Sequence, residues 1–253
     1  MPINFRSWFA PSEAACPVCG RNAVNSSSAI PVRHPTPRRI LSSLCASCLR
    51  SIPWIVHPLC RICGRMERCE DCVRRKARNY ALSRCAVRYD NTMKDWLALY
   101  KYRGNEQLES VLAAVLAFAY ERLTGTVTTG FQIITAVPIA PERMRDRGFN
   151  QAERLARRLA EWYGLDYETL LFRLRHTEKQ SLKSRRSRVV DMRGNFAAES
   201  SGLFSTSVAS TGILLIDDIY TTGSTLDECA RVLRESFHME NRPDVYGLLW
   251  ARS

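Results

Sequence analysis

The sequence GILLIDDIYTTGSTL, residues 212–226, decides the expected fold. Its four consecutive apolar residues, 213–216, are typical of a strand buried on both faces of a parallel sheet. Asp217 and Asp218 follow at the expected carboxyl end of that strand, and residues 221–225 are small and mostly hydroxylated. An amphipathic helix is expected next, with one apolar face made of Leu226, Cys229, Ala230 and Leu233. The stretch therefore predicts a strand, a loop and a helix of an α/β fold.

The loop after this strand is expected to bind the phosphate of a phosphorylated sugar. In an open α/β sheet, ligands bind outside the carboxyl ends of the strands, and a helix N-terminus presents unpaired N–H groups to an anion. Hydroxyl groups add donors, and a glycine lets the backbone turn closely round the phosphate oxygens. The residues expected to hold the phosphate are Thr221, Thr222, Gly223, Ser224 and Thr225.

The two neighbouring carboxylates, Asp217 and Asp218, would repel a phosphate. They are suited to accept hydrogen bonds from sugar hydroxyls or to face a Mg²⁺ ion. The alternative is an ordinary helix start, in which Thr225 is the N-cap, Glu228 closes a capping box and the aspartates are solvated. A cap and a phosphate site can coexist, so this alternative does not exclude the first interpretation.

The whole chain has the composition of a globular protein with anionic ligands. Its 253 residues allow one large or two modest domains, and 45% of them are hydrophobic. The longest apolar run, 111–119, is too short to span a bilayer, and the start of the sequence lacks a signal-peptide pattern, so we expect a cytoplasmic protein. A net charge of +12 favours nucleic acid or phosphorylated metabolites as ligands, without choosing between them.

Eight of the ten cysteines form C-x₂-C pairs, which indicates structural zinc rather than disulfides. CPVCGR at Cys16 resembles CRICGR at Cys60, and LCASCL at Cys45 resembles RCEDCV at Cys69. This internal repeat favours two sequential zinc sites, although an interleaved pairing stays open. The expected sites consist of Cys16, Cys19, Cys45 and Cys48, and of Cys60, Cys63, Cys69 and Cys72. We place a double zinc-ribbon domain at residues 1–78 and a second domain at 79–253.

A second strand, loop and helix unit is expected to supply cations to the same sheet. Residues 131–137 form an apolar strand, and arginines crowd the loop that precedes a helix capped by Asn150 and stopped by Gly164. Arginine suits a pyrophosphate because its planar fork binds oxygens bidentately. The candidate cations are Arg143, Arg145 and Arg147. Lys101 lies between two predicted helices, where reaching a phosphate and being solvated have equal weight.

These motifs resemble known families. The run of four apolar residues, Asp-Asp and Thr-Thr-Gly-Ser-Thr closely resembles the phosphoribosyl pyrophosphate (PRPP) loop of type I phosphoribosyltransferases. Together with RGFNQAERLA, YKYRGN and the paired zinc knuckles, it resembles the ComF family, which is named for competence and joins a zinc domain to a phosphoribosyltransferase-like domain. The resemblance implies a phosphoribosyltransferase-like parallel sheet with flanking helices, preceded by a small Cys-rich zinc-ribbon domain.

The resemblance also implies roles for single residues. Asp217 and Asp218 would face the ribose hydroxyls, residues 221–225 would hold the 5′-phosphate, and Arg143 and Arg147 would lie near the pyrophosphate. The sequence departs from the family at Asp191, where the family usually has asparagine, so no role is carried to that position.

Two functions follow as expectations. The first is a phosphoribosyltransferase that binds Mg²⁺–PRPP, with the basic segment 173–196 closing over the site and with an unidentified acceptor. The second is a binding module of the DNA-uptake machinery, in which the zinc ribbons and the same basic segment bind single-stranded DNA or competence proteins.

Overall fold

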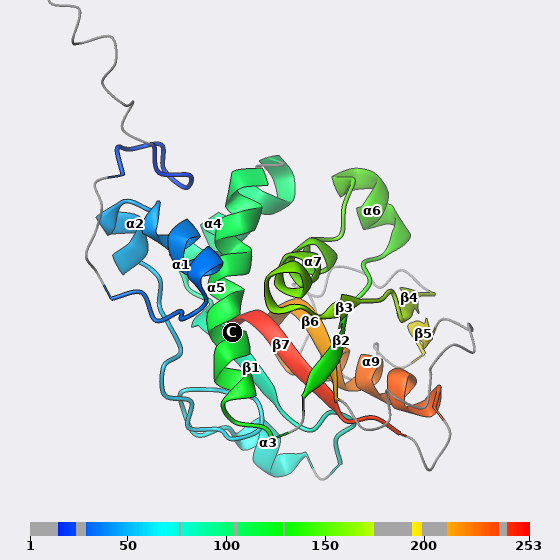
Figure 1. Cartoon of the computed structure of the whole chain (residues 1–253). Helices are drawn as coiled ribbons and strands as arrows, with labels where there is room; N and C mark the ends of the chain where they lie inside the picture. Colours follow the sequence, from blue (N-terminus) through cyan, green and yellow to red (C-terminus); the bar gives the residue numbers. More distant parts are fainter. Residues whose placement is uncertain are drawn as a thin grey trace, which may run out of the picture.

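The computed structural model describes most of the chain, namely residues 15–23, 29–75, 77–103, 106–128, 130–174, 194–198, 212–237 and 242–253. Five parallel strands form one twisted sheet with helices on both faces (Figure 1). Their order across the sheet is β1 (Ser83–Arg88), β7 (Val245–Arg252), β6 (Gly212–Tyr220), β2 (Phe131–Ala136) and β3 (Asp166–Tyr167). The expected parallel α/β sheet is thus present, and the quoted stretch supplies its central strand.

Strand β6 is longer than the apolar run predicts. It continues past the two aspartates, because Ile219 and Tyr220 still pair with Ala251 and Arg252 at the end of β7. The aspartates therefore precede the end of the strand instead of following it. This backbone pairing holds them within the sheet, which is a more rigid setting than a loop.

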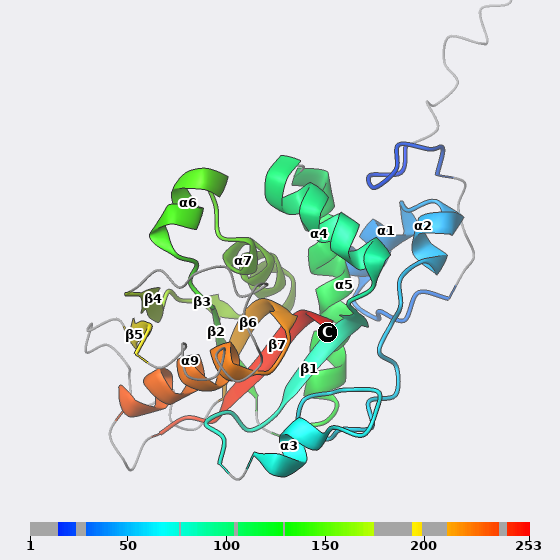
Figure 2. The same ribbon diagram turned by 180° about the vertical axis from the view of Figure 1, so that it is seen from behind.

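Helices α5 (Glu106–Thr124) and α7 (Gln151–Tyr163) cover one face of the sheet, and α9 (Ser224–Glu235) covers the other (Figure 2). Because successive side chains of a strand point to opposite faces, β6 contributes to both cores. Leu214 and Ile216 lie in the core beneath α5 and α7, whereas Ile213 and Leu215 pack with α9. The two remaining cysteines, Cys85 and Cys229, are buried in the α9 core, and the burial of Cys229 agrees with its place on the predicted apolar face.

Local signals place the ends of α7 correctly. The side chain of Asn150 accepts a hydrogen bond from the Ala152 amide at 3.1 Å, and its Nδ2 donates to the Val137 carbonyl at 3.0 Å. Gly164 ends the helix in the left-handed conformation, with φ of 67°. Two further helices, α4 (Asn91–Arg103) and α6 (Pro141–Arg147), contribute residues to the cleft described below.

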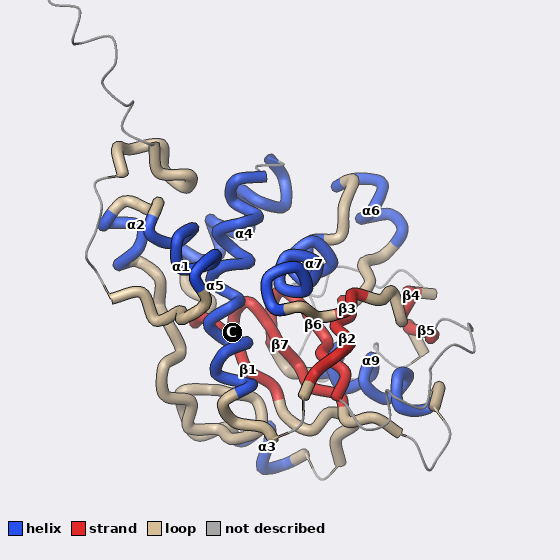
Figure 3. Tube along the Cα trace, in the orientation of Figure 1, coloured by secondary structure: helices blue, strands red, loops and turns tan. Residues whose placement is uncertain are grey.

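The described residues before β1 are mainly loop with three short helices (Figure 3), α1 (Pro35–Ser42), α2 (Ala46–Arg50) and α3 (Glu70–Arg74). They pack closely on the sheet, because Ser83 donates its amide to the Ile62 carbonyl at 2.6 Å and Arg88 donates to Pro53 at 3.0 Å. Helix α1 lies against α5. The proposed domain boundary at residue 78 stays a prediction, and in the described residues the two parts share their hydrophobic cores.

A short antiparallel pair, β4 (Leu171–Arg173) and β5 (Phe196–Ala198), lies beside the main sheet. Within the ranges that the structure describes, no helix has the length and apolar character required to span a bilayer.

Candidate functional site

A cleft of about 270 Å³ opens at the carboxyl ends of β2 and β6. This is the edge of the sheet at which a parallel α/β fold binds its ligands. Its lining includes most of the predicted site residues: Lys101, Arg143, Asp217, Asp218, Thr221 and Thr225. Gln151 and Arg173 line it as well. Gln151 was not predicted, and Arg173 was predicted only as part of the basic segment 173–196 that closes over the site.

Asp218 is held by two donors on the α7 side of the cleft. Lys101 Nζ forms a salt bridge with Asp218 Oδ2, and both side chains are only 16% exposed. Gln151 Nε2 donates to the same oxygen at 3.1 Å. Burial alone would raise the pKa of Asp218, but the charge of Lys101 and these hydrogen bonds lower that pKa to about 2. Asp218 is therefore ionised at neutral pH.

The pKa of Asp217 is shifted in the opposite direction to that of Asp218. Burial and the neighbouring charge of Asp218 raise the pKa of Asp217 well above its usual value. The Asp218 amide donates to Asp217 Oδ1 at 2.8 Å, which opposes the shift without cancelling it. The pair thus combines a stable carboxylate with a carboxyl group that favours its proton. Both groups can accept hydrogen bonds from hydroxyls, and a cation that binds to Asp217 would displace its proton to solvent.

The 221–225 loop runs from the end of β6 into the first turn of α9. The helix begins at Ser224, and its N-cap is Gly223, which has a φ of 78°. Thr222 Oγ1 lies 2.7 Å from Ser224 Oγ, while Thr221 and Thr225 line the cleft. The N-terminus of this 12-residue helix and the hydroxyl groups around it offer the donors that an anion site requires. They lie next to the carboxylate pair along the chain.

The alternative capping box is wrong. Gly223 occupies the N-cap position, so Thr225 lies within the first turn of α9. The carboxylate of Glu228 instead accepts from the Gly194 amide at 2.8 Å and from Arg231 at 2.7 Å. A tertiary contact and an arginine one turn further along the helix have taken the acceptor that a capping box needs.

The predicted arginines separate into two positions. Arg143 lines the cleft, whereas Arg147 does not belong to its lining. Arg147 donates to Gln151 Oε1, and its guanidinium lies 5.8 Å from the centre of the Tyr102 ring. Arg147 therefore acts on the cleft through Gln151 and Asp218, and no direct place beside a ligand is assigned to it. Arg145 is exposed, and its Nη2 lies 3.8 Å from Glu142 Oε1.

Arg173 is the second arginine of the cleft. Burial and the nearby charge of Arg143 lower its pKa, so two like charges are held close together. Its guanidinium also lies 5.3 Å from the centre of the Phe196 ring. The composition of the basic segment included Arg173, but only the pairing of β4 with β5 shows that it lies beside the sheet. Most of that segment, including Asp191, lies outside the described residues.

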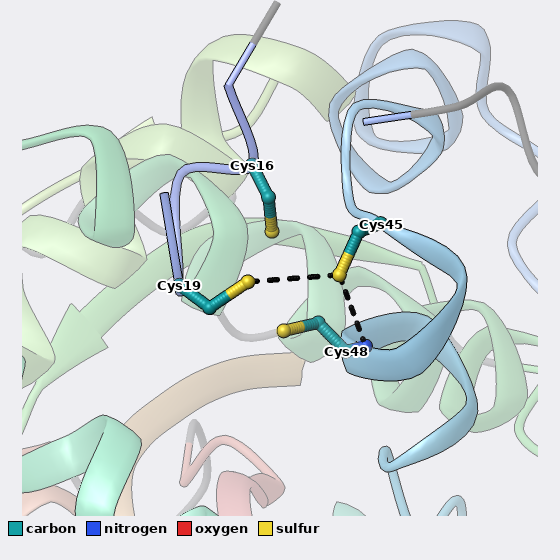
Figure 4. Close-up of side chains that lie close together, drawn as sticks. All are labelled: Cys16, Cys19, Cys45 and Cys48. Atoms are coloured by element: carbon teal, nitrogen blue, oxygen red, sulfur yellow. Dashed lines mark hydrogen bonds between the residues drawn. The ribbon is translucent and has the colours of Figure 1, made fainter. Parts of the chain in front are cut away.

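Two cysteine quartets lie in the N-terminal region, and they are those favoured by the internal repeat. The Sγ atoms of each quartet lie within 4.8 Å of one another. In the first quartet, Cys19 Sγ and Cys45 Sγ are 3.6 Å apart (Figure 4), and in the second, Cys63 Sγ and Cys69 Sγ are 3.5 Å apart. Zn–S bonds of about 2.3 Å in a tetrahedron require sulfur atoms at such separations.

The surroundings of the quartets agree with four thiolate ligands each. Cys45 Sγ accepts a hydrogen bond from the Cys48 amide at 3.5 Å, as expected for a knuckle that wraps a metal ion. His34 Nδ1 accepts a hydrogen bond from the Thr36 amide and so caps the N-terminus of α1, and His34 is not a member of either quartet. Each quartet fits one structural zinc ion.

Comparison with known proteins supports the sequence resemblance. No family model matches the chain. Competence protein ComFC of Bacillus subtilis strain 168 is 30% identical over 204 residues, covering 76% of this chain and 78% of the relative. Competence protein ComFC of Streptococcus pneumoniae is 31% identical over 228 residues, covering 87% and 94%. Competence protein F of Haemophilus influenzae is 25% identical over 202 residues, covering 77% and 85%.

Among solved structures, the allosteric regulatory enzyme of purine biosynthesis aligns with 50% of this chain and 23% of its own, with 21% identity and a TM-score of 0.29. The assignment rests on the sequence relatives, of which ComFC from both Bacillus and Streptococcus matches over most of its length. The chain belongs to the ComF family.

Proposed function

We propose that the chain binds Mg²⁺–PRPP, or a related phosphorylated ribose, in the cleft at the end of β6. The observation that carries this proposal is one juxtaposition: the 221–225 loop at a helix N-terminus, the Asp217–Asp218 pair and Arg143 share a single cleft. A sugar with a phosphate at one end and a pyrophosphate at the other needs these three kinds of group side by side.

Each group has a defined task in this proposal. Amides and hydroxyls of the 221–225 loop donate to the 5′-phosphate, and Asp217 and Asp218 accept hydrogen bonds from the ribose hydroxyls. Arg143 and Arg173 bind the pyrophosphate, which relieves the repulsion between two neighbouring guanidinium groups. Mg²⁺, when bound with PRPP, supplies further positive charge for the pyrophosphate oxygens.

The same arrangement suits displacement of pyrophosphate at the anomeric carbon. As the bond between the anomeric carbon and the pyrophosphate oxygen breaks, positive charge develops on the sugar ring and negative charge on the leaving pyrophosphate. The carboxylate of Asp218 stabilises the first charge, and the arginines stabilise the second. The acceptor nucleophile is left open.

The biological setting we propose is DNA uptake during natural transformation. Its support is the family: the ComFC relatives are named competence proteins, and the chain aligns with one of them over 94% of that relative's length.

Calorimetric titration of Mg²⁺–PRPP tests the ligand. Wild type is expected to bind, and Asp218→Asn and Arg143→Ala are expected to bind about 10- to 100-fold more weakly, since charged hydrogen bonds contribute about 1.5–3 kcal/mol each. Arg38→Ala removes the same charge as Arg143→Ala from an exposed site on α1 and is expected to bind like wild type. Failure of the wild type to bind Mg²⁺–PRPP would overturn the proposal.

A second candidate function is a binding module for single-stranded DNA without turnover. The observation that favours it is the net charge of +12, because lysines and arginines that neutralise phosphates give strong, salt-dependent affinity. Fluorescence anisotropy with an oligonucleotide over a salt series tests this function. DNA binding that survives Asp218→Asn, in a protein that does not bind Mg²⁺–PRPP, would favour the module.

A further inference from the structure

The two cysteine quartets pack against different parts of the protein. Cys16 and Cys45 of the first quartet belong to the core of α5 and α7, away from the 221–225 loop. The second quartet contributes Cys63, Cys69 and Cys72 to the core that also contains Tyr220 and Leu226. Only the second quartet therefore shares a core with the residues on either side of the loop.

Arg75 connects the second quartet to the loop. It directly follows α3, the helix that carries Cys72. Arg75 Nη2 donates to the Thr222 carbonyl at 3.1 Å, and Nη1 lies 3.9 Å from Asp227 Oδ1 in the first turn of α9. One guanidinium thus bridges the backbone of the loop and the helix that the loop begins.

Asn79 and Tyr80, a few residues further along the chain, reinforce this contact. The Asn79 amide donates to Asp227 Oδ1 at 2.9 Å, and Asn79 Nδ2 donates to the other carboxylate oxygen at 3.3 Å. The hydroxyls of Tyr80 and Tyr220 lie 2.8 Å apart, and both residues are 3% exposed. Arg75, Asn79 and Tyr80 therefore make polar contacts to both ends of the loop.

Tyr220 forms the floor of the loop. A Cβ atom on Gly223 would overlap the Tyr220 hydroxyl, so the ring lies directly against the left-handed turn at Gly223. Arg252, from the end of β7, donates to the carbonyls of Tyr220 and Thr221 at 3.0 and 2.9 Å. The sheet holds the loop from one side through Arg252, and Arg75, Asn79 and Tyr80 hold it from the other.

We propose that the second cysteine quartet is a positioning element for the 221–225 loop, and that Arg75 is the positioning residue that transmits its effect. A Cys-rich segment with little core of its own obtains much of its folding free energy from the metal it binds. An ion on Cys60, Cys63, Cys69 and Cys72 fixes α3 together with Arg75, Asn79 and Tyr80, and these residues fix the loop. The first quartet has no such role. The consequence for ligand affinity rests on the function proposed above, but the geometric claim does not.

Hydrogen–deuterium exchange of the zinc-loaded protein, without PRPP, tests the proposal. Arg75→Ala is expected to raise the exchange rate of the 221–229 amides by about tenfold or more, while α5 stays protected. Arg75→Lys, which keeps the charge and a donor, is expected to restore part of the protection. Arg74→Ala is the matched control, because Arg74 is the preceding residue and its side chain is 79% exposed. Wild-type exchange in Arg75→Ala would overturn the proposal.

A second comparison tests the difference between the quartets. Cys72→Ser is expected to expose the 221–229 amides, and Cys48→Ser is expected to leave them protected. Equal exposure in both variants would overturn the proposal, and if neither variant folds, the Arg75 comparison decides. Because no arm uses PRPP, a wild type that fails to bind Mg²⁺–PRPP defeats the proposed function alone. Normal PRPP binding together with unchanged loop exchange in Arg75→Ala defeats this inference alone.

Discussion

Lys101 of α4 and Asp218 of β6 form a salt bridge across the cleft. The carboxylate that we assign to the ribose therefore already has a counterion in the ligand-free protein. Gln151 donates to the same oxygen and in turn accepts from Arg147. A ligand hydroxyl or cation that approaches Asp218 must share or displace these hydrogen bonds. The network therefore contributes to the stability of the ligand-free protein and also influences its affinity for the ligand.

Replacing Lys101 by methionine is expected to destabilise the protein by about 1–3 kcal/mol at neutral pH, because Asp218 would lose its charged partner while remaining largely buried. Urea unfolding followed by circular dichroism measures the change. Lys94→Met is the matched control, since Lys94 is an exposed lysine of the same helix, and its effect is expected to stay within about 0.5 kcal/mol. Equal effects of the two substitutions would contradict the assigned role of Lys101.

The difference in stability between wild type and Lys101→Met is expected to shrink in acid. The pKa of Asp218 is lowered to about 2 in the folded protein, whereas an unfolded aspartate has a pKa of about 4. A depressed folded pKa contributes stability that is fully present above pH of about 4 and is lost as the pH falls through about 2. Urea unfolding at several pH values between these limits measures this loss, and a constant difference would contradict it.

Asp217→Asn is expected to stabilise the ligand-free protein at pH 7 by on the order of 1 kcal/mol while weakening Mg²⁺–PRPP binding. The raised pKa of Asp217 means that the folded state holds its proton more tightly than the unfolded state. Its ionisation therefore costs stability as the pH rises from about 4 through the folded pKa. Asparagine keeps the oxygen that accepts from the Asp218 amide but has no charge to bury. Thermal unfolding at pH 5 and pH 8 should show a gain that is larger at pH 8.

The sequence predicted those parts of the fold and the site whose signals are local. An apolar run identified β6, a small polar residue and a glycine marked the ends of α7, and two-residue cysteine spacings predicted the quartets that the structure brings together. Each signal arises from a few neighbouring residues that the backbone itself places together.

The parts that escaped prediction depend on tertiary contacts. The pairing of Ile219 with Ala251 extends β6, and the contact of Glu228 with Gly194 replaces the capping box. Gln151 carried a weak signal, since a polar residue in the first turn after Asn150 faces the same sheet edge as the aspartates. Nothing local distinguishes Arg143, which lines the cleft, from Arg147, which contacts Gln151.

Gly223→Ala is expected to destabilise the protein more than Gly148→Ala. Both glycines have left-handed backbones, with φ of 78° and 81°, so alanine introduces a conformational strain of about 1–2 kcal/mol at either position. A Cβ atom at Gly148 meets nothing within 4 Å, whereas at Gly223 it would overlap the Tyr220 hydroxyl. Urea unfolding of the two variants separates the strain from the overlap. Equal losses of stability would show that Tyr220 does not support the loop.

Zinc content distinguishes the sequential pairing from an interleaved one. The wild type is expected to carry two zinc ions, since each of the two quartets brings four sulfur atoms together. The double variant Cys16→Ser/Cys48→Ser removes two ligands from a single quartet and should retain about one ion per chain. Cys16→Ser/Cys72→Ser removes one ligand from each quartet and should retain less zinc than the first variant. In an interleaved pairing, Cys16 and Cys19 would share an ion with Cys69 and Cys72, and Cys45 and Cys48 would share one with Cys60 and Cys63. Cys16 and Cys48 would then bind different ions, while Cys16 and Cys72 would share one. The order of the two zinc contents, measured by mass spectrometry on folded protein, would then be reversed.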